Sequence, residues 1–321
     1  MTADLYVRPA LEDDDVQRAL ERWARAREVR DVGGTMSLNL HVVDEGVVLR
    51  VHPRFVVRKR VDALQAVRHR LLAHGLVVAE PIACDQHEGG RVTEVETYLE
   101  GREPPPTPDS YRWMFEAMGR LHSALATFDA SDVPPPGVAT WGPPTLLDEQ
   151  LALTAAAVAG DLEAAALAAH VRGLAELLAE QWIDESRLPN HLIHGDVRLG
   201  NVVAADGDGD GEAVYFDFGF MAVRPRVFDL AYSLSWIVLR PDDRGTAEEF
   251  DWSLAEDFIA AYESNAGATL TSLERRALWP YLASVPLYLA SIAGHTPDPA
   301  ARILVERPFL AIAEWLLRHR P

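Results

Sequence analysis

The hydrophobic pattern of this chain changes near residue 100, and that change limits the folds that the chain can adopt. Before it, β-prone runs alternate with single helical stretches, whereas after it the apolar residues recur almost everywhere at helical spacing. The change falls at Glu100-Gly101, just before a triple proline at 104–106 that is typical of a linker. The sequence therefore predicts a small N-terminal α+β lobe, residues 1–101, and a larger, mostly helical lobe, residues 102–321.

The N-terminal lobe should contain a small antiparallel sheet that carries one helix, with another helix ahead of it. Val16, Leu20 and Trp23 recur at helical spacing, which predicts a helix over about residues 10–28. Two β-prone runs separated by Asp44-Glu45-Gly46 predict a hairpin. The expected strands are 38–43, 47–51, 77–83 and 91–99, and the second helix is expected over 57–71, ending at Gly75.

The C-terminal lobe should be built mostly from helices. Two stretches interrupt this pattern: a proline-rich excursion over 133–144 that contains Trp141, and a short β-like pair over 201–204 and 213–216. A cleft between two such lobes is a favoured place for a ligand. The expected helices are 110–126, 146–180, 227–239, 247–264, 272–292 and 301–319.

Charge and cysteine content exclude several classes of partner and site. With 30 basic and 49 acidic residues the chain has a net charge of −19, which disfavours nucleic acid and anionic membranes as partners. Cys84 is the single cysteine, so neither an internal disulfide nor a cysteine-built metal site is expected. Residues 1–15 lack the pattern of a secretion signal, and the apolar run 281–294 is too short for a bilayer. These features predict a cytoplasmic protein.

The segment between residues 191 and 230 carries the chemistry. It contains His194-Gly195-Asp196, then Asn201 five residues after the aspartate, then Asp217-Phe218-Gly219 after a β-run, and finally Asp229-Leu230. Phosphoryl transfer from a nucleotide needs a carboxylate that accepts the proton of the attacking hydroxyl, and oxygen ligands for Mg²⁺ on the phosphates. Asp196, Asn201 and Asp217 can supply these groups.

This pattern resembles the aminoglycoside phosphotransferase and choline kinase family, whose H-G-D-x-x-x-x-N loop and D-F-G-like motif correspond to the catalytic loop and metal motif of protein kinases. The resemblance implies an α+β, protein-kinase-like bilobal fold. It also implies Mg²⁺-dependent transfer of the γ-phosphate of ATP or GTP to a hydroxyl of a small molecule. An aminoglycoside-like antibiotic and an amino alcohol metabolite are both open as acceptors, and a cationic acceptor is among the expectations.

By this resemblance each motif residue has an expected role. Asp196 would be the catalytic base, Asn201 and Asp217 the Mg²⁺ ligands, and Arg198 would stabilise charge on the transferred phosphate. His194 would brace the loop, and Asp229 would accept hydrogen bonds from its backbone amides. The expected nucleotide-binding residues are Gly34, Ser37, Asn39, Arg50, Gln65, Tyr98 and Leu99.

Two of these positions depart from the family pattern. The family has lysine, sometimes arginine, where Arg50 stands, and glutamate where the alignment places Gln65, so its ion pair would become an arginine with an amide partner. Two explanations are open. Lys59 is the only lysine of the chain, so arginine can simply stand wherever a basic residue is needed; alternatively, the change alters how the nucleotide is positioned. We favour the first alternative. The second leaves a nucleotide-binding pseudokinase open. A protein kinase is disfavoured because only residues 220–228 separate the D-F-G motif from Asp229.

Three other signals have ordinary explanations. Asp206, Asp208, Asp210 and Gly211 copy the start of a calcium loop, but the flanking strands favour a hairpin turn. Gly33-Gly34 could be an ordinary turn or a phosphate cradle. The acidic residues between 242 and 257 should form a solvated helix face, with a pocket for amines as the alternative.

Overall fold

The computed structural model has an α+β fold whose contacts group the chain into two compact units. We call the first the sheet unit, Met1–Pro106, Ala124–Ala139 and Leu199–Val223, and the second the helical unit, Thr107–Ser123, Thr140–Arg198 and Arg224–Pro321. The division into lobes at Gly101 stays a prediction. The structure describes residues 8–25, 27–86, 90–129, 133–136, 142–205, 211–238 and 248–319.

The sheet unit is built around a five-stranded antiparallel sheet in the order β1-β2-β3-β6-β5. The expected hairpin is confirmed, with Gly46 in a left-handed conformation at the end of its connection, the 3₁₀ turn Val43–Glu45. The strands are β1 (Val29–Asp31), β2 (Leu38–Val42), β3 (Val47–Val51), β5 (Pro81–Gln86) and β6 (Val92–Thr97).

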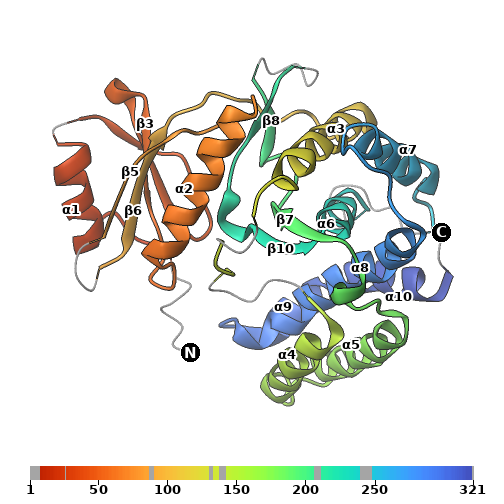
Figure 1. Ribbon diagram of the computed structural model, residues 1–321. Helices are drawn as coiled ribbons and strands as arrows, with labels where there is room; N and C mark the ends of the chain where they lie inside the picture. The colour runs from red at the N-terminus through yellow and green to blue at the C-terminus, as the bar shows by residue number, and fades with distance from the viewer. Residues whose placement is uncertain are drawn as a thin grey trace. The chain divides into compact units, whose positions relative to one another are not determined.

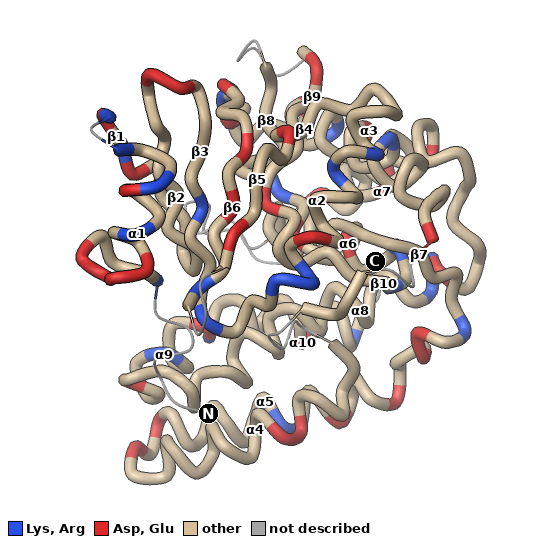
Figure 2. The backbone as a smooth tube through the Cα atoms, turned by 60° about the vertical axis from the view of Figure 1, so that its left-hand side comes forward, with Lys and Arg blue, Asp and Glu red and all other residues tan. Residues whose placement is uncertain are grey.

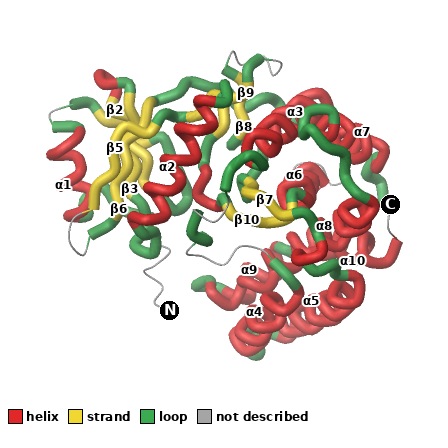
Figure 3. Tube along the Cα trace, in the orientation of Figure 1, coloured by secondary structure: helices red, strands yellow, loops and turns green. Residues whose placement is uncertain are grey.

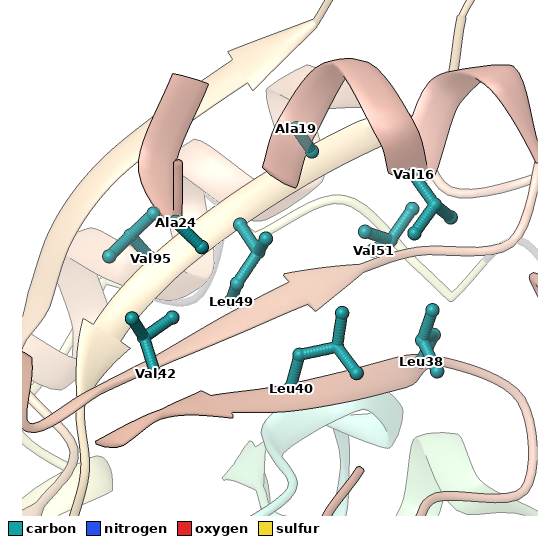
Figure 4. Close-up of a cluster of buried hydrophobic side chains, with 9 residues drawn as sticks. All are labelled: Val16, Ala19, Ala24, Leu38, Leu40, Val42, Leu49, Val51 and Val95. Atoms are coloured by element: carbon teal, nitrogen blue, oxygen red, sulfur yellow. The ribbon is translucent and has the colours of Figure 1, made fainter. Parts of the chain in front are cut away.

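Two helices lie on opposite faces of this sheet (Figures 1 and 3). α1 (Asp14–Trp23) packs Val16 and Ala19 against an apolar face, to which β2 contributes Leu38, Leu40 and Val42 (Figure 4). Because side chains alternate along a strand, the residues between them, Asn39 and His41, point to the other face. α2 (Arg58–Ala73) packs against β5 and β6. The sheet thus has one apolar face under α1 and one face that carries polar residues.

The expected strand over 77–83 is wrong, because the structure divides it. β4 (Val77–Val78) pairs in parallel with β9 (Ala213–Tyr215), and Pro81 begins β5 with an irregularity in its register. Proline has no backbone N–H to offer a ladder, which suits a strand boundary. The predicted pair over 201–204 and 213–216 is confirmed as β8 (Val202–Ala204) and β9, which are antiparallel.

The helical unit has α8 (Ser272–Ser291) at its centre, in contact with α4, α5, α6 and α10. Figure 3 shows the preponderance of helix in this part of the chain. The other helices are α3 (Pro108–Leu125), α4 (Pro144–Ala157), α5 (Leu162–Gln181), α6 (Val227–Val238), α7 (Trp252–Glu263), α9 (Pro299–Val305) and α10 (Arg307–His319), and a two-stranded sheet joins β7 (Asn190–Ile193) to β10 (Ala222–Pro225).

Two long helices expected from the sequence are each divided in the structure. The chain breaks between α4 and α5 because Asp161, after Gly160, caps α5 by accepting hydrogen bonds from Glu163 N and Ala164 N. It breaks again between α9 and α10, where Pro308 supplies no N–H to the turn before it. Helical periodicity continues across both breaks, so the pattern alone does not reveal them.

Among the described residues, the stretch Ser272–His295 is long and apolar enough to cross a membrane by length and composition. The apolar run expected over 281–294 is therefore part of a longer helix. Of this stretch's most apolar window, 72% is buried inside the protein, as in the core helix of a helical bundle.

The contact between α3 and α7 depends on a glycine. A Cβ atom at Gly119 would lie 2.5 Å from Tyr262 O and 2.8 Å from Asn265 Cβ, whereas nothing lies within 4 Å of one at Gly173 in α5. We expect Gly119→Ala to lower the free energy of unfolding by about 1–3 kcal/mol through overpacking. The matched change Gly173→Ala should raise it by about 0.5–1 kcal/mol through backbone entropy. Denaturant unfolding of both variants checks this, and equal effects would contradict the packing.

Candidate active site

The two expected metal ligands lie together at the end of the β8–β9 pair. Phe216 N donates to Asn201 O at 2.9 Å, which continues the antiparallel ladder and places Asn201 beside the residue that precedes Asp217. Asp217 has φ 56°, and it is the one non-glycine residue in the described ranges with positive φ. Its side chain is 42% exposed. A strained turn with an exposed carboxylate is typical of a residue that binds a ligand.

Arg60 of α2 fastens the turn that carries Asp217. Its guanidinium donates to Gly219 O and Met221 O, each at 2.8 Å, and also to Pro134 O. The residue is buried, and burial lowers the pKa of Arg60 to about 10, so it remains charged at neutral pH. The sequence analysis did not single out Arg60, because carbonyl acceptors leave no residue-type signal in a sequence.

The loop with the expected catalytic base belongs to the helical unit and is held by α6. Asp229 accepts hydrogen bonds from His194 N at 2.9 Å and Gly195 N at 2.8 Å. His122 Nε2 lies 2.9 Å from the same carboxylate. Burial would raise the pKa of Asp229, but hydrogen bonds and the nearby histidines outweigh it and lower that pKa. The expected role of Asp229 as an acceptor for backbone amides of the loop is confirmed.

Asp196 itself is buried and has two polar side chains next to it. The hydroxyl of Tyr232, on α6, hydrogen-bonds to Asp196, and Arg198 Nε lies 3.5 Å from Asp196 Oδ1. Burial and the charge of Asp196 raise the pKa of Tyr232 far above its usual range, so Tyr232 stays a donor. Asp196 N donates to His194 Nδ1 at 3.3 Å, which confirms that His194 braces the loop.

The paired glycines form a turn that only glycine can make. Gly33 and Gly34 have φ of 93° and 110°, and a Cβ at Gly34 would lie 2.5 Å from Asn39 Nδ2 and 2.6 Å from Ser37 O. Asn39 Nδ2 donates to Gly33 O at 2.9 Å. The structure therefore brings Gly34, Ser37 and Asn39 together, with Asn39 as a support of the turn.

The expected pairing of Arg50 with Gln65 is wrong. Arg50 Nη2 donates to Glu96 Oε1 of β6 at 2.9 Å, and Arg50 Nη1 lies 3.8 Å from Asp217 Oδ1. Gln65 Nε2 instead donates to Glu94 Oε1 at 3.0 Å and to Ala83 O at 3.3 Å. Glu94 and Glu96 stand at alternate positions of β6 and so share one face of the strand, but no local pattern tells which residues pair with them.

Tyr98, one of the expected nucleotide-binding residues, lies against the hairpin of β2 and β3. Tyr98 N donates to Gly46 O at 2.8 Å, and the Tyr98 ring stacks on His41 with centroids 3.7 Å apart. Leu99 is half-buried. A Cβ at Gly101 would lie 2.3 Å from a methyl of Val203, so the backbone approaches β8 closely here.

The structure describes some of the acidic residues that the sequence singled out and not others. Asp206, Asp208 and Asp210 lie outside the described residues, as do Trp141, Asp242 and Asp243. Of the described acids of the 242–257 cluster, Asp251 caps α7, Glu256 pairs with Arg275, and Asp257 pairs with Arg112; all are exposed. These contacts favour the solvated helix face. In the ranges that the structure describes, no group of three or more His, Cys, Asp or Glu side chains could hold a metal ion.

Comparison with known proteins decides the family. A model of the phosphotransferase enzyme family matches residues 28–279. The chain belongs to this family. As a member of the phosphotransferase enzyme family it is a small-molecule phosphotransferase, which confirms the resemblance drawn from the motifs. A search of curated proteins finds no match.

Solved structures share the fold. A microcompartment-associated aminopropanol kinase is 15% identical, with a TM-score of 0.68 over 94% of this chain and 96% of the other. An amicoumacin kinase in complex with AMP-PNP, Ca²⁺ and Ami is 14% identical, with a TM-score of 0.66 over 91% and 89%. The GDP complex of an aminoglycoside 2'-phosphotransferase is 15% identical, with a TM-score of 0.61 over 95% and 99%. They confirm the protein-kinase-like α+β fold.

Arg60 provides a test of how the Asp217 turn is held. We expect Arg60→Met to lower the free energy of unfolding by about 2–4 kcal/mol, because three carbonyl groups lose a charged donor. The neighbouring exposed Lys59 is the control, and Lys59→Met should change stability by less than about 0.5 kcal/mol. Denaturant unfolding measures both, and a similar small change in the two variants would contradict the role of Arg60.

Proposed function

We propose that this protein transfers the γ-phosphate of ATP or GTP to a hydroxyl group of a small molecule. The observation that carries the proposal is the end of the β8–β9 pair, where the Asp217 carboxylate and Asn201 lie together and Arg50 approaches Asp217 to 3.8 Å. A nucleotide triphosphate with its metal ion has a cation and negative phosphate oxygens. The two oxygen ligands would bind the cation, and the guanidinium would bind the phosphate oxygens.

Mg²⁺ fits the side chains present. Mg²⁺ sites of this kind take one or two protein oxygens and complete the octahedron with phosphates and water, so Asn201 and Asp217 would be sufficient. When bound, the ion would neutralise charge that develops on the phosphates. The solved amicoumacin kinase complex contains a nucleotide analogue and Ca²⁺, which supports a divalent ion in this fold.

Asp196 would accept the proton of the attacking hydroxyl. The hydroxyl of Tyr232 hydrogen-bonds to this carboxylate, and Arg198 Nε lies 3.5 Å from its Oδ1. The backbone of its loop is fixed by Asp229, so a small acceptor would meet a preorganised base. Arg198 is 45% exposed, and its side chain could turn from Asp196 to the transferred phosphate.

The residues near Asp196 support an acceptor with a cationic group. Trp236 lies one helical turn after Tyr232 on α6, with ring centroids 6.0 Å apart, and is 43% exposed. An exposed indole beside the tyrosine that hydrogen-bonds to Asp196 suits an ammonium group by cation–π attraction. Amino alcohols and aminoglycoside-like antibiotics both combine an amine with a hydroxyl. The names of the solved aminopropanol kinase and aminoglycoside 2'-phosphotransferase support these two classes.

The two carboxylates should separate chemistry from nucleotide binding. Asp196→Asn should lower kcat by about 10²-fold or more, while nucleotide affinity stays within a few-fold, because the base acts on the acceptor. Asp217→Asn should lower both, because that carboxylate would hold the ion on the phosphates. Coupled ADP release over aminoglycosides, amino alcohols and sugars, with calorimetry of nucleotide binding, measures this. The exposed Glu212→Gln is the control, and near-normal turnover of Asp196→Asn would remove it as the base.

Trp236 should affect the binding of the acceptor and not that of the nucleotide. We expect Trp236→Ala to raise the Michaelis constant of a cationic acceptor by about five-fold, the value of one cation–π contact, and to leave that of the nucleotide unchanged. Leu153→Ala, an exposed apolar change on α4, is the control. Steady-state kinetics with an amino alcohol and with its uncharged diol analogue measure the effect. An equal rise for both acceptors would show that the indole does not recognise charge.

A further inference from the structure

The polar face of the five-stranded sheet carries two buried carboxylates on one strand. The register pairs Asn39 with Arg50 and Arg50 with Glu94, and it pairs Val48 with Glu96, so Arg50, Glu94 and Glu96 point to one face. Glu94 and Glu96 are 4% and 3% exposed. Figure 2 marks the acidic positions of β6 in red and the basic positions of β3 and α2 in blue. Burying two carboxylates costs several kcal/mol unless each has a charged partner.

Two arginines neutralise these carboxylates. Arg68 of α2 is buried and pairs with both Glu94 and Glu96, and Arg50 of β3 donates to Glu96 at 2.9 Å. Burial alone would raise the pKa of Glu96, but the charges of Arg50 and Arg68 outweigh it and lower the pKa to about 2. The network therefore contains two positive and two negative charges.

A histidine on the same face leaves this balance unchanged. His52 Nε2 lies 3.3 Å from Glu94 Oε2, but burial and the charge of Arg50 lower the pKa of His52 to about 3. It is neutral at physiological pH. Gln65 stands on α2 where the family has a glutamate. Its side chain donates to Glu94 and to Ala83 O, and no hydrogen bond to Arg50 is found among the described residues.

Arg50 is thus held by Glu96 at one edge of its guanidinium, and the other edge lies beside Asp217. Glu96 holds Nη2, whereas Nη1 is 3.8 Å from Asp217 and the buried Nε has no hydrogen-bond partner within the described residues. A guanidinium has five donors in a rigid plane, so fixing one edge also sets the direction of the others. The anchor comes from the neighbouring strand, so Arg50 needs no contact with α2 to keep its direction.

We propose that Glu96 of β6 is the positioning residue that directs Arg50 toward the nucleotide phosphates, and that Arg68 holds Glu96 in place. In the family pattern, α2 would carry the glutamate that anchors the basic residue. Here α2 contributes Arg68, one turn after Gln65, and the anchoring glutamate is Glu96 of the sheet. This inference rests on the proposed function, because it needs a nucleotide whose phosphates Arg50 contacts. It predicts that nucleotide affinity depends on Glu96 only through Arg50.

The experiment measures the dissociation constant of Mg²⁺ with ATP, and with GTP, by calorimetry on the full chain. Glu96→Gln should weaken nucleotide binding by about ten-fold, the value of one charge-assisted hydrogen bond. In an Arg50→Met background the same change should add less than about two-fold, since the coupling is lost. The Michaelis constant of the acceptor should stay unchanged.

The matched control is Glu94→Gln. Glu94 has the same strand, burial and Arg68 partner as Glu96, but among the described residues it forms no ion pair with Arg50, so this variant should lose stability and keep nucleotide affinity within about two-fold. Glu96→Asp keeps the charge and withdraws it from Arg50, so it should weaken binding even where Glu96→Gln fails to fold. Equal weakening by both glutamate variants, or a full effect of Glu96→Gln in the Arg50→Met background, would overturn the proposal. A wild-type protein that binds neither nucleotide would overturn the proposed function itself.

Discussion

The sheet unit depends on a network of buried ion pairs in which two carboxylates are neutralised by two arginines. Glu94 and Glu96 lie on the polar face of β6, and the arrangement is stable only while Arg50 and Arg68 reach them from β3 and α2. Removing one partner leaves an uncompensated ion in a low-dielectric surrounding. This requirement ties two strands and one helix to a single geometry, and it leaves one edge of Arg50 available beside Asp217.

Two other buried ions hold the functional loops, and both bind backbone groups. Asp229 accepts from two amides of the loop that carries Asp196, and Arg60 donates to three carbonyls, two of them in or just after the turn that follows Asp217. A charged group forms stronger hydrogen bonds than a neutral one, so each fixes a short irregular segment that has no ladder of its own. The two loops therefore owe their conformations to side chains from α6 and α2, respectively.

The sequence was most informative where function depends on local order along the chain. The spacing of Asp196, Asn201 and Asp217 predicted the family, and periodicity located most strands and helices. It was least informative where partners are distant: the register of β3 and β6 joins Arg50 to Glu96, 46 residues away, and no local pattern encodes that register. The break at Gly160 was missed because an Asp161 cap outweighs a continuing helical period. Arg60 was missed because its acceptors are carbonyls, which every residue has.

The central claim is that a phosphoryl group passes from a nucleotide to a hydroxyl of a small molecule. Mass spectrometry of the acceptor after incubation with Mg²⁺ and ATP or GTP tests it most directly, because it detects the product and not only nucleotide turnover. We expect at least one amino alcohol or aminoglycoside to gain one phosphoryl group, in equal amount to the ADP or GDP formed. A protein that binds the nucleotide but phosphorylates no hydroxyl compound, with diphosphate formed only at the rate of spontaneous hydrolysis, would contradict the account.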